Sequence, residues 1–332
     1  MSRPATSVQF GFNFQTNAAI VLMLENMAEM ETVRVEGKED IEIQLNDESY
    51  VLAQAKSVEK SSTDFNNVRA NAKKAINTLS ESAQGINVRD LIYITNSPNP
   101  FKDDSSKPDF YGRAHKKYDE LPQSTKDIIT SFLSDIKMPL DTRKFEIQVL
   151  PFESDDDRQR YRVVLEEISD FIGELDISAD GLRKRLHEVW SSILTKNGTR
   201  KDESLKINKK DVIWPVIVFV TGKGELNREA QYCNFLDDAI FDEVNRKYGE
   251  LIDYYSERYD VASKIIADFT ASERNGRDAI TSFINEHWED YQSDLGIYTL
   301  ETDIRSNLMK IIMYTVLKKR FDINKIKRIV NL

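Results

Sequence analysis

The chain has 332 residues, enough for two domains with their own cores, and its content of 40% hydrophobic and 31% charged residues is typical of a soluble globular protein. Its formal net charge of -10 argues against a simple DNA-binding protein, because phosphate contacts require lysine and arginine. A single cysteine, Cys233, excludes an internal disulfide, and three scattered histidines give no zinc-ligand spacing. The sequence has no long apolar run and no signal peptide, which predicts a cytoplasmic protein without a membrane segment.

The first predicted elements are a helix that packs on a sheet and the first strand of that sheet. Residues 2–14 are expected to form an extended lead-in to a helix over about 16–30. That helix is apolar on nearly all sides, which predicts that it is buried against a sheet. Residues 32–36 are predicted to be the first strand.

A β-hairpin follows. Residues 40–45 and 50–56 alternate between apolar and polar side chains, and they flank a short polar segment at residues 46–48. Folding about Asp47 opposes two apolar pairs, Ile41 with Ala53 and Ile43 with Val51. That face of the hairpin is therefore predicted to lie in the core.

The same register brings polar groups together at one end of the hairpin. It places Asp40 opposite Gln54, and Lys56 projects from the same side because strand side chains repeat every two residues. Asp40 and Gln54 are candidate ligands of Mg²⁺, and Lys56 is a candidate group for stabilising charge on a phosphodiester. Glu36 is a candidate additional ligand. The alternative is a solvated hairpin face with ordinary charged residues.

The motif Asp40, then Gln54-Ala55-Lys56, resembles the core of the PD-(D/E)xK nuclease superfamily in its Q-x-K variant, as found in Mrr-like restriction enzymes. The flanking residues 11–15 and 35–37 are similar to the double-strand DNA endonuclease domain of CD-NTase-associated effectors, which the nuclease subunit of Lamassu-type anti-phage systems shares. The resemblance implies a DNA endonuclease that uses Mg²⁺ or Mn²⁺. Many relatives carry a glutamate where this chain has Gln15, so the number of bound metal ions stays open.

The elements after the hairpin complete the predicted first domain, residues 1–153. A helix over about 65–82 carries Arg69 and Lys73 on one face with Lys74 at its margin, as candidate DNA contacts or as a solvated face. Residues 90–96 and 144–152 are predicted strands. Between them lie an irregular insertion over 97–123 and a helix over 124–137 capped by Ser124. The predicted fold class is α/β, a restriction-endonuclease-like mixed sheet flanked by helices.

The second predicted domain, residues 154–332, is mainly α-helical and serves regulation or assembly. Helices are expected at about 157–173 and 179–196, followed by a basic loop over 197–211. Residues 212–220 are strand-like, although Pro215 confines such a strand to an edge. Gly222-Lys223-Gly224 lacks the rest of a phosphate-binding loop, so a turn is expected. The remaining helices are predicted at about 225–256, 260–268, 276–291 and 301–321.

The Lamassu-like resemblance implies a nuclease held inactive by an SMC-like ATPase and a small accessory subunit until foreign DNA is sensed. Because one nuclease site cuts one strand, cleavage of double-stranded DNA predicts a homo-oligomer in the active state. Three alternatives stay open. They are a CD-NTase-linked effector activated by a cyclic nucleotide, an Mrr-like enzyme acting on modified DNA, and a non-catalytic DNA-tethering or assembly subunit.

Overall fold

The computed structural model describes residues 5–61, 63–177, 181–202, 204–221, 238–276, 278–295 and 300–332. The chain forms two compact units, one comprising residues 1–215 with 330–332 and the other residues 216–329. The domain boundary predicted at 153/154 lies inside the first unit, because the two helices that follow it pack against the first helix of the chain.

The first unit is built on a seven-stranded mixed sheet with the order β5-β6-β4-β3-β2-β1-β7. Its strands are β1 (Met30–Val35), β2 (Ile41–Leu45), β3 (Tyr50–Lys56), β4 (Val88–Thr95), β5 (Ala114–Lys117), β6 (Phe145–Val149) and β7 (Ile207–Asn208). The three central strands β3, β4 and β6 are parallel, and the other pairings are antiparallel. The structure is therefore an α/β fold, as the sequence predicts.

The predicted hairpin register is confirmed. In the pairing of β2 with β3, Ile41 lies opposite Ala53 and Ile43 lies opposite Val51. All four side chains are buried. The apolar alternation is sufficient to fix this register, because a shift by one residue would turn the whole apolar set toward solvent.

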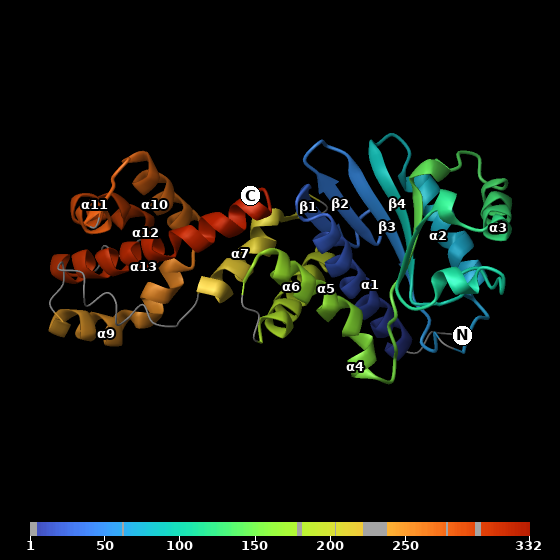
Figure 1. Ribbon diagram of the computed structural model, residues 1–332, viewed down its shortest axis with the longest axis horizontal. Coiled ribbons are helices and arrows are strands. Elements are labelled where there is room, and N and C mark those ends of the chain that lie inside the picture. Colours follow the sequence, from blue (N-terminus) through green and yellow to red (C-terminus); the bar gives the residue numbers. More distant parts are fainter. Residues whose placement is uncertain are drawn as a thin grey trace. The chain divides into compact units, whose positions relative to one another are not determined.

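Helices cover both faces of the sheet (Figure 1). On one face, α1 (Ala5–Glu25) packs against α5 (Arg162–Glu174) and α6 (Leu182–Gly198), with the short α4 (Asp157–Arg160) before them. On the other face, α2 (Val68–Ser82) and α3 (Gln123–Leu133) bury an apolar core against β3, β4 and β6. The sheet thus separates two layers of helices.

The first helix differs from the prediction at its start. Residues 18–23 of α1 are buried as predicted, but the helix already begins at Ala5, so the extended lead-in is wrong over its described part. Phe10 and Phe14, one helical turn apart, pack on Phe152 with ring centroids 5.2 and 5.4 Å away. Phe10, Phe12 and Phe14 stand at every second position, a spacing that favours an extended segment. In the helix they lie on different sides, and Phe12 is exposed.

The insertion over 97–123 is less irregular than predicted. It contains β5, which extends the sheet beyond β6, and two short 3-10 helices, η1 (Lys107–Phe110) and η2 (Tyr118–Glu120); a third, η3 (Thr142–Lys144), precedes β6. The predicted cap of α3 is wrong. The helix begins at Gln123 without a side-chain cap, and the Ser124 hydroxyl instead donates to Asp103 Oδ2 at 2.7 Å.

The strand predicted over 212–220 is wrong, because this segment lies in the helix α7 (Lys209–Thr221). Its β-branched residues favour a strand locally, but burial of Val212, Ile213 and Val216 in the helical conformation overrides that preference. The Trp190 indole donates to the main-chain oxygen of Val212 at 2.9 Å. Pro215 lies inside α7, and the two units divide directly after it.

The second unit is helical, as predicted. Its elements are α9 (Asp238–Ser256), α10 (Tyr259–Ala271), α11 (Ala279–His287), η5 (Trp288–Tyr291), α12 (Gln292–Leu295) and α13 (Thr302–Ile329). The Gly222-Lys223-Gly224 turn and Cys233 lie outside the described residues. In the part of the chain that the structure describes, every helix is too short or too polar to cross a bilayer.

Candidate functional site

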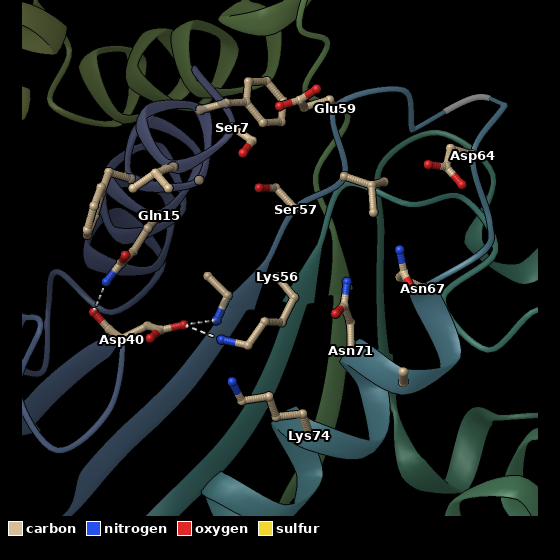
Figure 2. Close-up of a pocket in the computed structure, with 17 residues that line it drawn as sticks. Ser7, Gln15, Asp40, Lys56, Ser57, Glu59, Asp64, Asn67, Asn71 and Lys74 are labelled. Carbon is tan, nitrogen blue, oxygen red and sulfur yellow. Dashed lines mark hydrogen bonds and ion pairs between the residues drawn. The ribbon is translucent and has the colours of Figure 1, made fainter. Parts of the chain in front are cut away.

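The end of the β2–β3 hairpin brings Asp40 and Lys56 together, as the sequence predicts. Asp40 directly precedes β2, and its Oδ2 accepts hydrogen bonds from the main-chain N–H of Ala55 at 2.8 Å and from Lys56 Nζ at 3.1 Å. Both side chains are 22% exposed, so the ion pair is partly open to solvent. Figure 2 shows the two contacts of the Asp40 carboxylate. The arrangement places a carboxylate and an ammonium group next to each other.

This pair lies in a cavity of about 630 Å³, here called the Asp40 cavity. Its walls come from the first half of α1, the end of β3, residues 57–59 and 64 of the following loop, and one face of α2. Five charged side chains line it, namely Asp40, Lys56, Glu59, Asp64 and Lys74. Three carboxylates against two ammonium groups give the lining a net charge of -1, so the cavity without a cation does not attract an anion.

Gln54 is placed differently from its predicted neighbours. It follows the expected strand alternation, but its side chain is only 4% exposed, and the cavity wall at this point consists of Ala55 and Lys56. Gln54 is a buried polar residue that does not line the cavity. The prediction that it is a metal ligand remains a prediction.

Gln15, on α1, lies directly beside Asp40 (Figure 2). Its Nε2 donates to the main-chain oxygen of Asp40 at 2.7 Å, and the side chain is buried. A glutamate at this position, as the resemblance implies for many relatives, has no N–H to donate in that direction. The glutamine therefore holds the main chain that carries the candidate metal ligand.

The side chain of Glu36 lies in another cavity. It lines a second cavity of about 470 Å³, here called the Glu36 cavity, between α1, the end of β1 and α6. It is absent from the lining of the Asp40 cavity. The Glu36 N–H donates to the main-chain oxygen of Asp40 at 3.0 Å, but the structure does not bring the Glu36 side chain into the cavity of Asp40 and Lys56. Its backbone has a φ of 56°, and this left-handed turn directs the chain away from the end of β1.

The three basic residues predicted on α2 separate into two groups. Arg69 and Lys73 lie over the Phe132 ring on α3, each 5.9 Å from the ring centroid, whereas Lys74 lines the Asp40 cavity. Asn67, Asn71 and Lys74 share the α2 face toward the cavity (Figure 2). Lys74 is thus the only one of the three candidate DNA contacts that the structure places at this site.

Glu39 is a residue that sequence reasoning missed. Its side chain is 3% exposed, and both carboxylate oxygens are buried without a hydrogen bond of regular geometry. Burial is the main reason that the pKa of Glu39 is raised to about 7, and the neighbouring Asp40 charge adds to it, whereas the Ser82 hydroxyl and Lys56 act in the opposite direction. In the sequence it is one of several acidic residues near the hairpin, and nothing in that pattern marks it as buried.

The residues at the site fit a loosely held hard cation. Mg²⁺ is commonly bound through one or two carboxylates and keeps several water ligands. Asp40 offers one carboxylate, whose Oδ2 already has the Lys56 ammonium group as a positive partner at 3.1 Å. Among the described residues, no group of three or more histidine, cysteine, aspartate or glutamate side chains has a metal-binding arrangement. Water or substrate oxygens must therefore supply most of the ligands.

Comparisons with known proteins give little guidance. No family model and no curated protein matches the chain. Three solved chains of an Acinetobacter baumannii Cap4 SAVED/CARF-domain containing receptor, without ligand and with the cyclic trinucleotides 2'3'3'-cAAA or 3'3'3'-cAAA, match at 15% identity. Their TM-scores are 0.36 to 0.37, and the matches cover 65% of this chain and 45% to 47% of the solved chains. TM-scores of this size do not establish a shared fold.

Proposed function

We propose that the chain is a metal-dependent DNA endonuclease of the PD-(D/E)xK type with a restriction-endonuclease-like core. The observation that carries the proposal is the contact between Asp40 and Lys56 at 3.1 Å, at the end of a hairpin whose register agrees with the Q-x-K motif. The partly exposed pair and the adjoining cavity of about 630 Å³ give an extended phosphodiester a route to these groups.

In the proposed reaction the chain's residues have separate tasks. Asp40 would hold Mg²⁺ or Mn²⁺, with Gln54 as a second ligand if its buried amide turns toward the cavity. The bound ion would supply Lewis-acid activation and charge neutralisation. Lys56 would release Asp40 and direct its ammonium group at the phosphate oxygens, where negative charge grows during the reaction. Gln15 would keep the main chain of Asp40 in place through the 2.7 Å hydrogen bond.

The charge of the Asp40 cavity is expected to make substrate binding depend on a metal ion. With a net charge of -1 among its lining residues, the cavity disfavours a phosphodiester until a cation binds. One divalent cation changes the balance to +1. Substrate binding is therefore expected to depend on the cation, which also suits a nuclease that must stay inactive until it is activated.

The biological setting is proposed from the resemblance of residues 11–15 and 35–56. It is that of an effector in a bacterial anti-phage or anti-plasmid defence system. Partner subunits, an SMC-like ATPase and a small accessory subunit, would hold the nuclease inactive, and assembly on foreign DNA would bring two copies together for cleavage of both strands.

Cleavage of supercoiled plasmid by the full chain with Mg²⁺ or Mn²⁺ tests the activity. Asp40→Asn and Lys56→Met are each expected to reduce the cleavage rate by at least about 100-fold, the usual effect of removing one transition-state contact. Lys60→Met, in the loop after β3 but outside the cavity lining, is the matched control and is expected to cut normally. Cleavage by the Asp40 and Lys56 variants at the wild-type rate would overturn the assignment.

One observation favours a second candidate, a non-catalytic DNA-tethering subunit with a degenerate nuclease core. Asp40 already has a positive partner in Lys56, and Gln54 is buried, so cation binding has only one exposed carboxylate at this point. Calorimetric titration with Mn²⁺ separates the two candidates. Saturable binding that Asp40→Asn removes supports the enzyme, and its absence supports the tethering role.

A further inference from the structure

The Glu36 cavity has an unusual lining for a protein that acts on DNA. Of the described residues that line it, none is lysine, arginine or histidine, and Glu36 is the only carboxylate. The rest of the polar lining consists of amides and hydroxyls. A phosphate group is therefore unfavourable inside this cavity, whereas a neutral or cationic ligand with hydrogen-bonding groups is favourable.

Several polar groups in this cavity have unused hydrogen-bonding capacity. The hydroxyl oxygen of Ser191 is buried and has no hydrogen-bond partner among the described residues. The side chains of Gln9, Glu36 and Thr195 make no hydrogen bond to the described part of the chain. Gln9, Glu36 and Thr195 are exposed, so a ligand that supplies both donors and acceptors can take the place of water at these side chains.

An aromatic side chain lies at the boundary between the two cavities. Phe12 is 54% exposed, although large apolar side chains on a helix usually face the core. Phe12 and Gln15 both line the Asp40 cavity and the Glu36 cavity, so the first half of α1 forms a shared wall. A planar ring placed against Phe12 would be next to the site proposed for the phosphodiester.

The floor of the Glu36 cavity depends on a close helix-to-strand contact. A Cβ added at Gly198, at the end of α6, would lie 3.1 Å from Val35 Cγ2 and 3.5 Å from Glu36 Cγ. Glycine therefore lets the end of α6 approach the end of β1 closely at this side of the cavity.

We propose that the Glu36 cavity binds a nucleobase that carries an exocyclic amino group, with Phe12 as its stacking surface and Glu36 as the acceptor of the amino group. Carboxylates and amides are the side chains that recognise such base edges, and bases stack on aromatic rings. The volume of about 470 Å³ lies within the usual range of small-ligand sites. Where the base comes from a DNA strand held in the Asp40 cavity, the inference rests on the proposed nuclease function; a free nucleoside is the other source.

Titration of the full chain with adenosine, cytidine and thymidine, followed by ligand-observed NMR, tests the site without any cleavage. Adenosine and cytidine are expected to bind, and thymidine, which lacks the exocyclic amino group, about tenfold more weakly. Thr195→Trp fills the cavity from an exposed position. It is expected to weaken adenosine binding at least about tenfold, because the indole would occupy the space that the base needs. Lys196→Trp, adjacent on α6 but outside the lining, is the matched control.

Absence of saturable binding by all three nucleosides, or equal losses in Thr195→Trp and Lys196→Trp, would overturn the proposal. Binding of a fluorescent DNA duplex to the Lys56→Met variant with Mg²⁺ present, where Asp40 is kept and cleavage is slow, then identifies the source of the base. If the base belongs to a DNA strand, Thr195→Trp is expected to weaken binding of an intact duplex but not of a duplex with abasic sites. If the ligand is a free nucleoside, Thr195→Trp is expected to leave binding of both duplexes unchanged. Because nucleoside binding needs neither Asp40 nor cleavage, failure of the nuclease proposal leaves this result unchanged.

Discussion

Lys73 and Lys74 are neighbours in the sequence, yet their side chains face different parts of the molecule. Lys73 Nζ lies 2.7 Å from Asp135 Oδ2 and also over the Phe132 ring, so it is engaged with α3 and the loop after it. Lys74 lines the Asp40 cavity and has no ion pair with a described residue. One residue turns a helix by about 100°, which separates the two ammonium groups.

This separation predicts different effects on DNA. Lys74→Ala is expected to weaken duplex binding several-fold and to reduce the slope of log affinity against log salt by about one, because one phosphate contact is lost. Lys73→Ala is expected to leave both quantities unchanged. Fluorescence anisotropy at several salt concentrations with Mg²⁺ present measures both, in the Lys56→Met variant as background so that cleavage is slow and Asp40 is kept. Equal effects of the two substitutions would contradict the assignment of Lys74 to the site.

The hairpin could be predicted in detail because its signal is local. Strict alternation of apolar residues fixes the register, and the register places Asp40 and Lys56 on one side, where the structure has them 3.1 Å apart. The face of α2 is harder to predict. Periodicity groups Arg69 with Lys73, but only the packing of α2 against β3 and α3 determines that Lys74 is the residue facing the cavity.

Other features depend on contacts between distant segments, and no local pattern contains them. Glu36 follows β1 directly, but a left-handed turn and the approach of α6 place it in a different cavity from Asp40. The apolar, β-branched segment 212–220 becomes helical because its surroundings bury it in that form. Burial of Glu39 likewise arises from the loop before β2 packing near α2, which the sequence around it does not indicate.

Glu39 gives the stability of the protein a predictable pH dependence. Its pKa is raised from 4.5 to about 7, mainly by burial, so the folded state binds the proton more tightly than the unfolded state does. The stabilisation is complete below about pH 4.5 and is lost as the pH rises through about 7. The full effect is at most about 3 kcal/mol.

Glu39→Gln should remove this dependence and make the variant more stable than wild type at pH 8. Urea unfolding at pH 5 and pH 8 measures the difference. Glu31→Gln, at an exposed position of β1, is the matched control and should leave the dependence as it is in wild type. A Glu39→Gln variant that still loses as much stability as wild type between the two pH values would show that another group is responsible.

Lys209 forms hydrogen bonds both to the loop before β1 and to the last residues of the chain. Its Nζ donates to the main-chain oxygens of Ala28 at 3.0 Å and Val330 at 2.9 Å, and burial lowers its pKa. Lys209→Met should destabilise the first unit by about 2–3 kcal/mol, because buried carbonyl groups lose a charged donor.

Urea unfolding of the full chain measures this loss, with the midpoint followed by tryptophan fluorescence, to which Trp190, buried in the first unit, contributes. Lys210→Met, exposed and next in the helix, is the control and should change the stability by less than about 0.5 kcal/mol. Equal stability of the Lys209 and Lys210 variants would mean that the Lys209 contacts do not hold the chain end in solution.

Gln15 allows a direct test of why this chain has an amide beside Asp40. Gln15→Glu replaces the group that donates to the Asp40 main-chain oxygen with a second carboxylate close to the site. Two opposing effects follow. The loss of a buried hydrogen bond should destabilise the fold by about 1–3 kcal/mol. The added negative charge should raise the affinity for Mn²⁺ at least about tenfold, because two carboxylates attract a divalent cation more strongly than one.

Calorimetric titration with Mn²⁺ and urea unfolding with and without the metal measure the two effects on the same variant. Gln9→Glu, on the same helix but in the lining of the Glu36 cavity only, is the control for adding one charge to α1. Equal gains in Mn²⁺ affinity for both variants would mean that general charge, and not proximity to Asp40, is responsible. A gain confined to Gln15→Glu would place the cation beside Asp40 and support Gln15 as the residue that keeps the site weakly binding in this chain.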